Sequence, residues 1–478
     1  MALDFTPTTI DDLDPDRRPS FRLALVPVFA VVLFLGIGSA VLGLDPHVPL
    51  LWSIVVTGAF GRYLGYTWDD LSDGIINGLL MGMQALLIIF TIYALIATWV
   101  DAGTIPAMMY YGLELLSPGV FLPVAAILAA VVAFSIGSSW TTVGTLGVAF
   151  VGIGAGLGVP GPMTVGAVIS GAYAGDKQSP LSDTTNLAAG VTNTPLYDHI
   201  YRMRTGTAIA FGLSVLGFAA LGLQFSGAVP AGQVAEIQTA LAGAYSLSVL
   251  AFVPLVVTFG LALRGYPALP TLVTGVFAGI ITAILVQGTG FVPAWEVFMG
   301  GTAPETGSDL VNDLLATGGL TGSAWTITVV VAALSLGGLL ERIGVLAVLA
   351  NQLSQGVRSS GSLIAGTGVS AIVVNALTAQ QYMSIVLPGV TLRNLYDEFG
   401  LDSEELSRAV EAAGTPTGAL LPWHAGGVYM AGATGVATLE YAPFYLFGFL
   451  SPLVLFAMAL SGRGIPTTSR AERAQHAD

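Results

Sequence analysis

The sequence predicts an all-α polytopic membrane protein with about 11–12 membrane elements, some of them broken helices or re-entrant segments. Two observations support this fold class. Hydrophobic residues make up 54% of the 478 residues and charged residues only 9%, against about 25% charged in an ordinary soluble domain. Uncharged runs that could span a hydrocarbon core, which takes about 20 helical residues, also recur along the whole chain. They cover residues 23–44, 74–100, 115–175, 205–235, 237–263, 265–295, 314–340, 359–392 and 441–462.

The two ends of the chain differ from this apolar pattern. Residues 1–22 are expected to form a polar cytoplasmic tail rather than a signal peptide, because five aspartates precede Arg17, Arg18 and Arg22. Arginines beside a span favour the cytoplasmic side, and the tail 463–478 carries three more. We therefore expect a multi-pass protein of the cell membrane with both termini in the cytoplasm.

The charge balance is strongly acidic, with a formal net charge of −14 and a single lysine. One interpretation is a surface adapted to a salty cytoplasm, as in halophiles. The other is that acidic loops steer cations toward a pore mouth. The chain has no cysteine, which excludes disulfides and thiolate metal sites.

The apolar region divides into two halves with related patterns. We assign 23–226 to a first transmembrane repeat, 227–240 to a connecting segment and 241–462 to a second repeat. Each half contains a polar interruption of an apolar run, and a second polar cluster follows at a similar spacing. The two pairs cover residues 134–145 and 176–186 in the first half, and 375–382 and 414–424 in the second.

Matching Gly175 to Gly414 superposes these pairs at an offset of 239. Such paired interruptions are typical of transporters built from two inverted repeats. The alternative is chance, since Gly, Ser and Thr are common in membrane helices. Backbone groups freed by a break are tolerated only inside protein or along a cavity, where half-helix ends bind ions. Pro180 and Pro422 each disfavour a continuous helix at these points.

The cluster 176–186 contains Lys177, the only lysine, between Asp176 and Asp183. A charged side chain costs roughly 2.5 kcal/mol or more at the bilayer centre, so such groups are usually functional. Oxygen ligands suit a hard cation such as Na⁺ by the logic that governs Ca²⁺ and Mg²⁺. We therefore predict an ion site, with Na⁺ held by Ser182, Asp183, Thr184 and Asn186.

Two carboxylates also allow coupling to protons. A desolvated aspartate that binds either a proton or Na⁺ is a minimal exchanger. We assign that role to Asp183, and to Asp176 the role of a second titrating or gating group. Lys177 is expected to pair with Asp176 or Asp183 when the site is empty. The alternative is that Asp176 and Lys177 form an exposed loop pair of little energetic weight.

His424 is the only histidine within an apolar stretch. It could handle protons near neutral pH, or it could be a packed imidazole beside Trp423. The polar interruptions supply the remaining candidates for ion or substrate binding, which are Ser138, Ser139, Thr141, Ser179, Thr185, Asn375, Thr378, Gln381, Thr415, Thr417 and Trp423.

The string from Gly175 to Ala188, GDKQSPLSDTTNLA, closely resembles the signature of the NhaC-type sodium/proton antiporters of the ion-transporter superfamily. The similarity continues at 197–200, at 137–145 and at 375–389, and through Pro422 and Trp423. It therefore covers more than half of the chain. The resemblance implies Na⁺ extrusion in exchange for H⁺, with pH and salt homeostasis as the purpose.

One position departs from the family pattern. After Pro422 and Trp423 the family usually has Asn, and this chain has His424. Relatives of the family exchange Na⁺ and H⁺ against organic acids such as malate and lactate, so an organic-acid or amino-acid exchanger is the second hypothesis. A passive cation channel is a weaker third.

The sequence predicts a transporter rather than an enzyme. It contains no His-Glu-x-x-His zinc motif and no Gly-x-Ser-x-Gly elbow. We expect no cofactor besides the transported Na⁺ and H⁺, and we expect contact with membrane lipid but not with nucleic acid. Association into a homodimer stays open.

Overall fold

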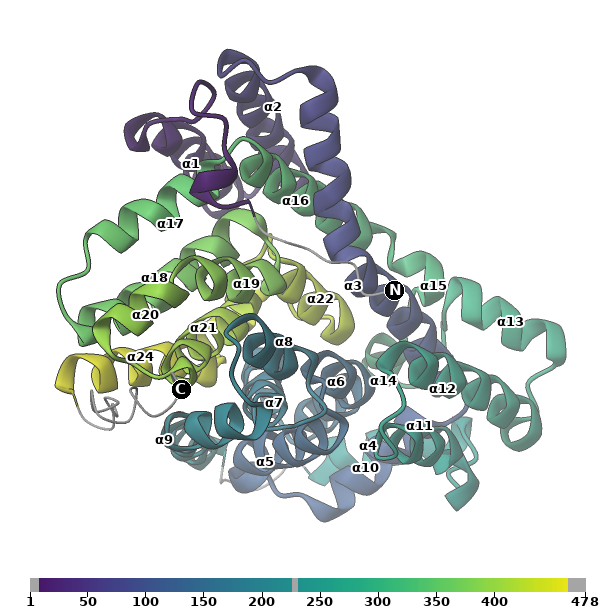
Figure 1. The fold of residues 1–478 in the computed structure, drawn as a ribbon. Helices are drawn as coiled ribbons and strands as arrows, with labels where there is room; N and C mark the ends of the chain where they lie inside the picture. The colour runs from purple at the N-terminus through teal and green to yellow at the C-terminus, as the bar shows by residue number, and fades with distance from the viewer. Residues whose placement is uncertain (1–7, 226–230, 463–478) are drawn as a thin grey trace.

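The computed structural model describes residues 8–225 and 231–462, and this part of the chain is helical without strands (Figure 1). The predicted all-α fold class is confirmed. The first half consists of α1 (Phe21–Leu35), α2 (His47–Tyr63), α3 (Trp68–Asp101), α4 (Thr104–Leu115), α5 (Pro118–Ile136), α6 (Ser139–Gly156), α7 (Gly161–Asp176), α8 (Asp183–Val191) and α9 (Leu196–Gly222).

Two helices, α10 (Ala231–Ala244) and α11 (Val253–Ala262), connect the halves. The second half consists of α12 (Ala268–Thr282), α13 (Phe291–Gly300), α14 (Asp309–Leu315), α15 (Gly319–Gly322), α16 (Ala324–Arg342), α17 (Val345–Gln355), α18 (Ser360–Thr378), α19 (Gln381–Thr391), α20 (Arg393–Phe399), α21 (Ser403–Thr417), α22 (Ala425–Thr434), α23 (Thr438–Tyr441) and α24 (Leu446–Ser461).

Among the described residues, seven helices are long and apolar enough to cross a membrane, or up to nine spans if each of two bent pairs counts as one. The bent pairs are α10 with α11, at 91°, and α23 with α24, at 53°. This number is lower than the 11–12 elements expected from the uncharged runs. Several helices that follow a polar interruption are too short to span a membrane, because α8, α19 and α22 have 9, 11 and 10 residues.

Around the two breaks, the helices of the two halves are related by a common offset of 242 in residue number. Helices α5 and α18 begin at Pro118 and Ser360 and end at Ile136 and Thr378, so this offset relates both of their ends. The first residues of α7 and α21, and those of α8 and α22, have the same separation. We call residues related by this offset repeat-equivalent.

The breaks after α5 and α18 have the same backbone geometry. Gly137 ends α5 with φ 73° and ψ 35°, and its equivalent Ala379 ends α18 with φ 54° and ψ 23°. The next residues, Ser138 and Gln380, are extended, with φ −155° and −134°, and they cap α6 and α19. The offset of 239 suggested by the sequence is therefore wrong by three positions, since it places Ser138 opposite Leu377.

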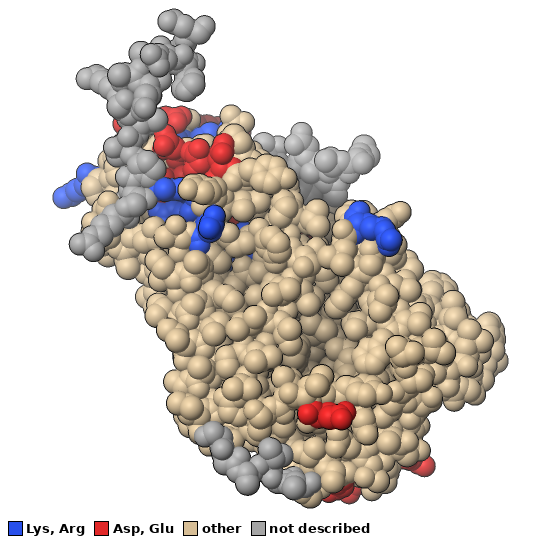
Figure 2. All heavy atoms as spheres, turned by 90° about the horizontal axis from the view of Figure 1, so that it is seen from below, with Lys and Arg blue, Asp and Glu red and all other residues tan. Residues whose placement is uncertain are grey.

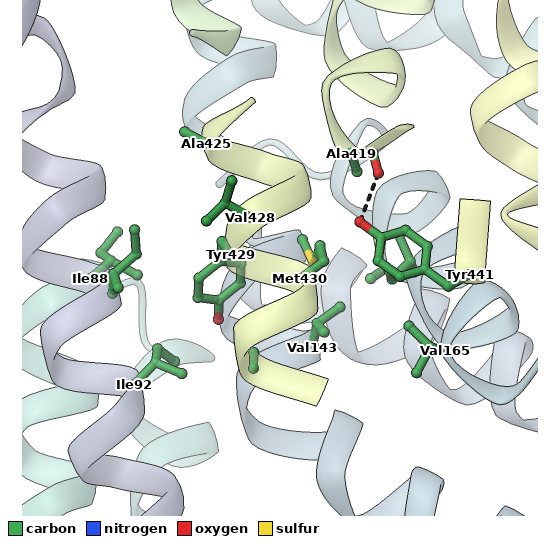
Figure 3. Packing of buried hydrophobic residues seen from close by; sticks show 14 of the residues in the cluster. Ile88, Ile92, Val143, Val165, Ala419, Ala425, Val428, Tyr429, Met430 and Tyr441 are labelled. Carbon is green, nitrogen blue, oxygen red and sulfur yellow. Dashed lines mark hydrogen bonds between the residues drawn. The ribbon is translucent and has the colours of Figure 1, made fainter. Parts of the chain in front are cut away.

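The interior beside these breaks is closely packed. Tyr429 lies on the side of α22 that faces Ile88 and Ile92 of α3 (Figure 3). Its hydroxyl donates a hydrogen bond of 2.7 Å to the carbonyl of Trp140, in the first turn of α6. A Cβ atom on Gly144 would lie 2.5 Å from the Tyr429 hydroxyl, so the close approach of α6 and α22 requires glycine there.

On the face shown in Figure 2, a broad uncharged zone separates the charges at the upper end from those at the lower end. Lys and Arg side chains appear only toward the upper end of that face, and the lower end shows only Asp and Glu. This distribution fits a protein whose uncharged belt faces lipid.

Candidate ion site between the two helix breaks

A cavity of about 60 Å³ lies between the two breaks. Since one buried water needs roughly 10–15 Å³ in this measure, the cavity has room for about four waters. Its walls come from α3 and α16, from both breaks, and from the starts of α8 and α22. The lining residues are Gly82, Ala85, Ile88, Ser138, Ser139, Trp140, Asp176, Asp183, Thr184, Val330, Leu334, Gln380, Gln381, Tyr382, His424 and Ala425.

The cavity walls follow the repeat. Ten of the lining residues form five repeat-equivalent pairs, so the cavity lies where the two halves meet. The pairs are Ser138 with Gln380, Ser139 with Gln381, Trp140 with Tyr382, Ile88 with Val330, and Asp183 with Ala425.

Asp176, the last residue of α7, is only 2% exposed. Its Oδ2 accepts a hydrogen bond of 3.0 Å from the backbone N–H of Ser139. Ser139 begins α6, and the amino end of a helix carries partial positive charge that stabilises an anion. The other carboxylate oxygen, Oδ1, is buried and has no hydrogen-bond partner among the described residues. Asp176 is therefore held in place by one oxygen only.

Asp183, at the start of α8, lines the cavity and remains accessible to solvent. Its Oδ2 accepts a hydrogen bond of 2.5 Å from the hydroxyl of Tyr382, and its Oδ1 accepts one of 2.8 Å from the backbone N–H of Thr184. Among the described residues, neither Asp183 nor Asp176 has a basic group within 4.0 Å. Two carboxylates that share a cavity without a basic partner favour a bound cation.

Aromatic rings complete the walls at both breaks. Trp140 stacks on Tyr429 with ring centroids 4.4 Å apart, which fixes the indole beside the cavity. Tyr382, the repeat-equivalent of Trp140, is oriented by its bond to Asp183. Aromatic faces of this kind attract cations.

His424 caps α22 and also lines the cavity. Its Nδ1 accepts a hydrogen bond of 2.9 Å from the backbone N–H of Gly426, and its Nε2 lies 3.1 Å from Oδ1 of Asn375. Because Nδ1 is an acceptor, the ring proton belongs on Nε2, where it donates to Asn375. This arrangement fits a neutral, packed imidazole, one of the two interpretations of His424 from the sequence.

Lys177 is fully buried and lies outside the cavity walls. Its Nζ donates a hydrogen bond of 2.9 Å to Oγ of Ser451 and lies 5.2 Å from the centroid of the Phe447 ring. It does not make the expected pair with Asp176 or Asp183. The alternative of an exposed Asp176–Lys177 loop pair is excluded as well, because both side chains are buried.

Comparison with known proteins matches residues 171–463, more than half of the chain, to the Na⁺/H⁺ antiporter family. The chain belongs to this family. The NhaC Na⁺/H⁺ antiporter of Alkalihalophilus pseudofirmus is 38% identical over 93% of this chain and 96% of its own. The predicted NhaC-type resemblance is thus confirmed, and the relatives are transporters rather than enzymes.

Other relatives in the antiporter family have different named substrates. An arginine/ornithine antiporter of Halobacterium salinarum is 53% identical over 96% of both chains. A malate-2H⁺/Na⁺-lactate antiporter of Bacillus subtilis is 33% identical over 89% of this chain and 93% of its own. Membership of the family therefore establishes an antiporter but does not fix which solutes it exchanges.

Seven of the candidate residues named from the sequence line the cavity of this antiporter. They are Ser138, Ser139, Asp176, Asp183, Thr184, Gln381 and His424. The others lie outside the cavity walls: Thr141, Lys177, Ser179, Ser182, Thr185, Asn186, Asn375, Thr378, Thr415, Thr417 and Trp423.

The predicted set of Na⁺ ligands is only half assembled at the cavity. Asp183 and Thr184 line it, and Ser182 is buried beside Thr184, with 3.1 Å between the two hydroxyl oxygens. Asn186 instead donates its side-chain amide to the carbonyls of Pro180 and Ser182 and is exposed. Its role here is to close the turn before α8.

Sequence reasoning did not select several residues that the structure brings to the site. Trp140, Gln380 and Tyr382 line the cavity, and their position within the two polar interruptions was the available signal. Glu411 and His199 form a fully buried pair behind Thr184. No sequence pattern distinguished Glu411 from a surface glutamate on a polar helix.

Proposed function

We propose that this antiporter exchanges Na⁺ for H⁺ across the cell membrane and that the cavity between the two breaks binds the transported ion. The observation that carries the proposal is the pair of aspartates, Asp176 and Asp183, which share the cavity and have no basic group within 4.0 Å in the described part of the chain. Hydroxyl and carboxylate oxygens suit Na⁺. The cavity has room for about four waters, which matches a small ion better than a large solute.

Exchange follows if Na⁺ and a proton compete for the same carboxylates. A proton on Asp183 removes the charge that attracts Na⁺, and bound Na⁺ drives the proton off. Asp176 adds a second charge to the site. We further propose that the two halves are inverted relative to each other, because transporters with alternating access have their site at the interface of such repeats. We also propose that both termini are cytoplasmic.

Reconstituted liposomes containing a pH dye test this proposal. NaCl, KCl, malate, and arginine with ornithine are added separately to vesicles that hold a preformed proton gradient. The proposal predicts proton movement on addition of NaCl alone, and its loss in Asp183→Asn. If the addition of Na⁺ to vesicles with the wild-type protein causes no proton movement, Na⁺/H⁺ exchange is refuted.

A second candidate function is the exchange of cationic amino acids. The relative that is 53% identical is named an arginine/ornithine antiporter, and the acidic, aromatic-walled cavity suits a guanidinium or ammonium group. The cavity would have to widen to admit arginine. Uptake of labelled arginine into ornithine-loaded liposomes, without dependence on Na⁺, would establish this function in place of Na⁺/H⁺ exchange.

A further inference from the structure

A second buried carboxylate lies behind the cavity. Glu411 of α21 is 0% exposed. Its Oε1 accepts hydrogen bonds from the hydroxyls of Thr184 and Thr185, at 3.3 and 3.1 Å, and its Oε2 lies 2.6 Å from Nε2 of His199. Because Thr184 lines the cavity, a single hydroxyl group separates Glu411 from the ion site.

The hydrogen-bonded chain continues from Glu411 toward the surface. Nδ1 of His199, which is itself fully buried, lies 2.8 Å from Oγ of Ser407. Ser407 is in the first turns of α21, whose starting residues Ser403 and Glu404 are partly exposed. Asp198, next to His199, is exposed. The hydrogen-bonded chain thus runs from Thr184 at the cavity to Ser407, which is itself buried and donates to the carbonyl of Glu404 in the partly exposed start of α21.

The repeat shows that the fold does not need this buried pair. The repeat-equivalent of Glu411 is Ile169, which is equally buried. The repeat-equivalent of His199 is Tyr441, whose hydroxyl bonds the backbone carbonyls of Ala419 (Figure 3) and Gly427. Burying a charge is costly unless it is paired, and apolar residues often stabilise such positions as well or better. Stability alone therefore does not explain why Glu411 is buried here.

The surrounding charges leave His199 as the basic partner of Glu411. Arg202 and Arg408 both bond to Glu405, one and a half turns earlier on α21. Lys177 bonds to Ser451 instead, although Lys177 and Asp183 are near enough to feel the charge of Glu411. The other helices that contact α21 are α18 and α24, which carry no ionisable side chain, and α19 and α20. Those two bring Tyr382, Arg393, Tyr396, Asp397 and Glu398.

We propose that His199 and Glu411 form the route by which protons reach the cavity, separate from the path of the transported cation. The proposal rests on Na⁺/H⁺ exchange as the function. A proton arriving from the Ser407 side binds Nδ1 of His199, and the proton on Nε2 moves to Oε2 of Glu411. The carboxyl group of Glu411 then rotates, because Thr184 bonds to Oε1 and not to Oε2. Oγ1 of Thr184 accepts the proton while its own hydroxyl proton turns away from Glu411 and passes into the cavity. One proton is delivered and each group keeps its original number of protons; the proton left on Nδ1 of His199 returns to the Glu411 side when the ring turns over.

The test measures two activities of the same reconstituted full-length protein. The first is Na⁺-driven proton movement, and the second is exchange of ²²Na⁺ for Na⁺ across the vesicle membrane, which needs no proton. The variant Glu411→Gln keeps the shape of the side chain but cannot carry a proton. We expect proton movement to fall by about 100-fold, the usual contribution of a positioned proton-transfer group, with ²²Na⁺ exchange close to the wild-type rate.

Each other outcome contradicts the route. Equal retention of both activities in Glu411→Gln shows that protons bypass this residue. Equal loss of both in a protein that melts like the wild type makes Glu411 part of the cation site, as we expect for Asp183→Asn. If Glu411→Gln does not fold, the same pair of assays on His199→Gln decides by the same criteria. A wild-type protein without Na⁺-driven proton movement would instead refute the proposed function.

Discussion

The imidazole of His424 occupies the space that a side chain on Gly418, the repeat-equivalent of Asp176, would need. A Cβ atom on Gly418 would lie 2.4 Å from Cε1 of His424. In the first repeat Asp176 is instead paired with the small Ser182, the repeat-equivalent of His424. The two breaks therefore share backbone geometry but differ in chemistry: one presents a carboxylate, and the other a neutral imidazole.

Because the His424 ring fills the space beside Gly418, we predict that Gly418→Ala displaces this ring and so disturbs the cavity. Overpacking of this kind costs about 1–3 kcal/mol, so a lower melting temperature and slower transport are expected. Gly190→Ala is the matched control, because Gly190 is also helical, in α8, but has open space around it. In the double variant Gly418→Ala/His424→Asn, the asparagine is smaller than histidine and leaves room for the alanine Cβ atom, so stability should be restored. Additive losses in that double variant would show that the two residues do not interact.

Tyr382→Phe removes the hydroxyl that bonds Oδ2 of Asp183. Hydrogen bonds to charged groups are worth about 1.5–3 kcal/mol, and this one orients a carboxylate of the ion site. We expect the Na⁺ concentration for half-maximal exchange to rise by about 10-fold, with a maximal rate near that of the wild type. Tyr396→Phe is the control, since that hydroxyl bonds Thr367 away from the cavity. An unchanged Na⁺ dependence in Tyr382→Phe would remove Tyr382 from the site.

Ala379→Gly should stabilise the protein. Ala379 holds φ 54° at the second break, and the left-handed conformation costs a residue with a Cβ atom roughly 1–2 kcal/mol. Glycine removes that strain but adds unfolded-state entropy, so a net gain of about 0.5–1 kcal/mol is expected. The reverse change at the equivalent position, Gly137→Ala, should destabilise, since its Cβ would lie 2.5 Å from the backbone carbon of Leu181. Thermal melts in detergent measure both, and a lower melting temperature for Ala379→Gly contradicts the prediction.

Lys177→Met tests why the only lysine is buried. Its Nζ has one hydrogen bond, to Ser451, and no carboxylate within 4.0 Å among the described residues. Since a buried charge can be replaced by an apolar group of similar size without loss of stability, the variant should melt at or above the wild-type temperature. Transport should slow, because the charge between Asp176 and Glu411 is lost. A protein that melts several degrees lower would show that Lys177 serves the fold.

The sequence was sufficient to predict the fold class and the two helix breaks that flank the cavity. Composition and uncharged runs indicated membrane helices, and the polar interruptions at 134–145 and 375–382 coincide with the two breaks. The predicted repeat offset differed from the observed one by three residues, because it was based on matching Gly175 with Gly414. The backbone instead pairs Gly137 with Ala379, which no residue pattern links.

The chemistry of individual residues was harder to predict than their neighbourhood. Asn186 follows Asp183 within one turn, yet its amide is used to close the preceding turn. Lys177 follows Asp176 directly, but its side chain points to Ser451 on α24. Glu411 bonds to Thr184 although the two are far apart in the sequence, on α21 and α8. Such contacts depend on tertiary packing, which neither spacing nor composition encodes.

If one cavity binds either Na⁺ or a proton, the binding of Na⁺ must release protons. NaCl can be titrated into weakly buffered, detergent-solubilised protein while both Na⁺ binding and pH are recorded. We expect proton release on Na⁺ binding, and we expect both signals to disappear in Asp183→Asn and to weaken strongly in Asp176→Asn. Na⁺ binding without proton release, or binding unchanged in both variants, would show that the cavity is not shared by the two ions.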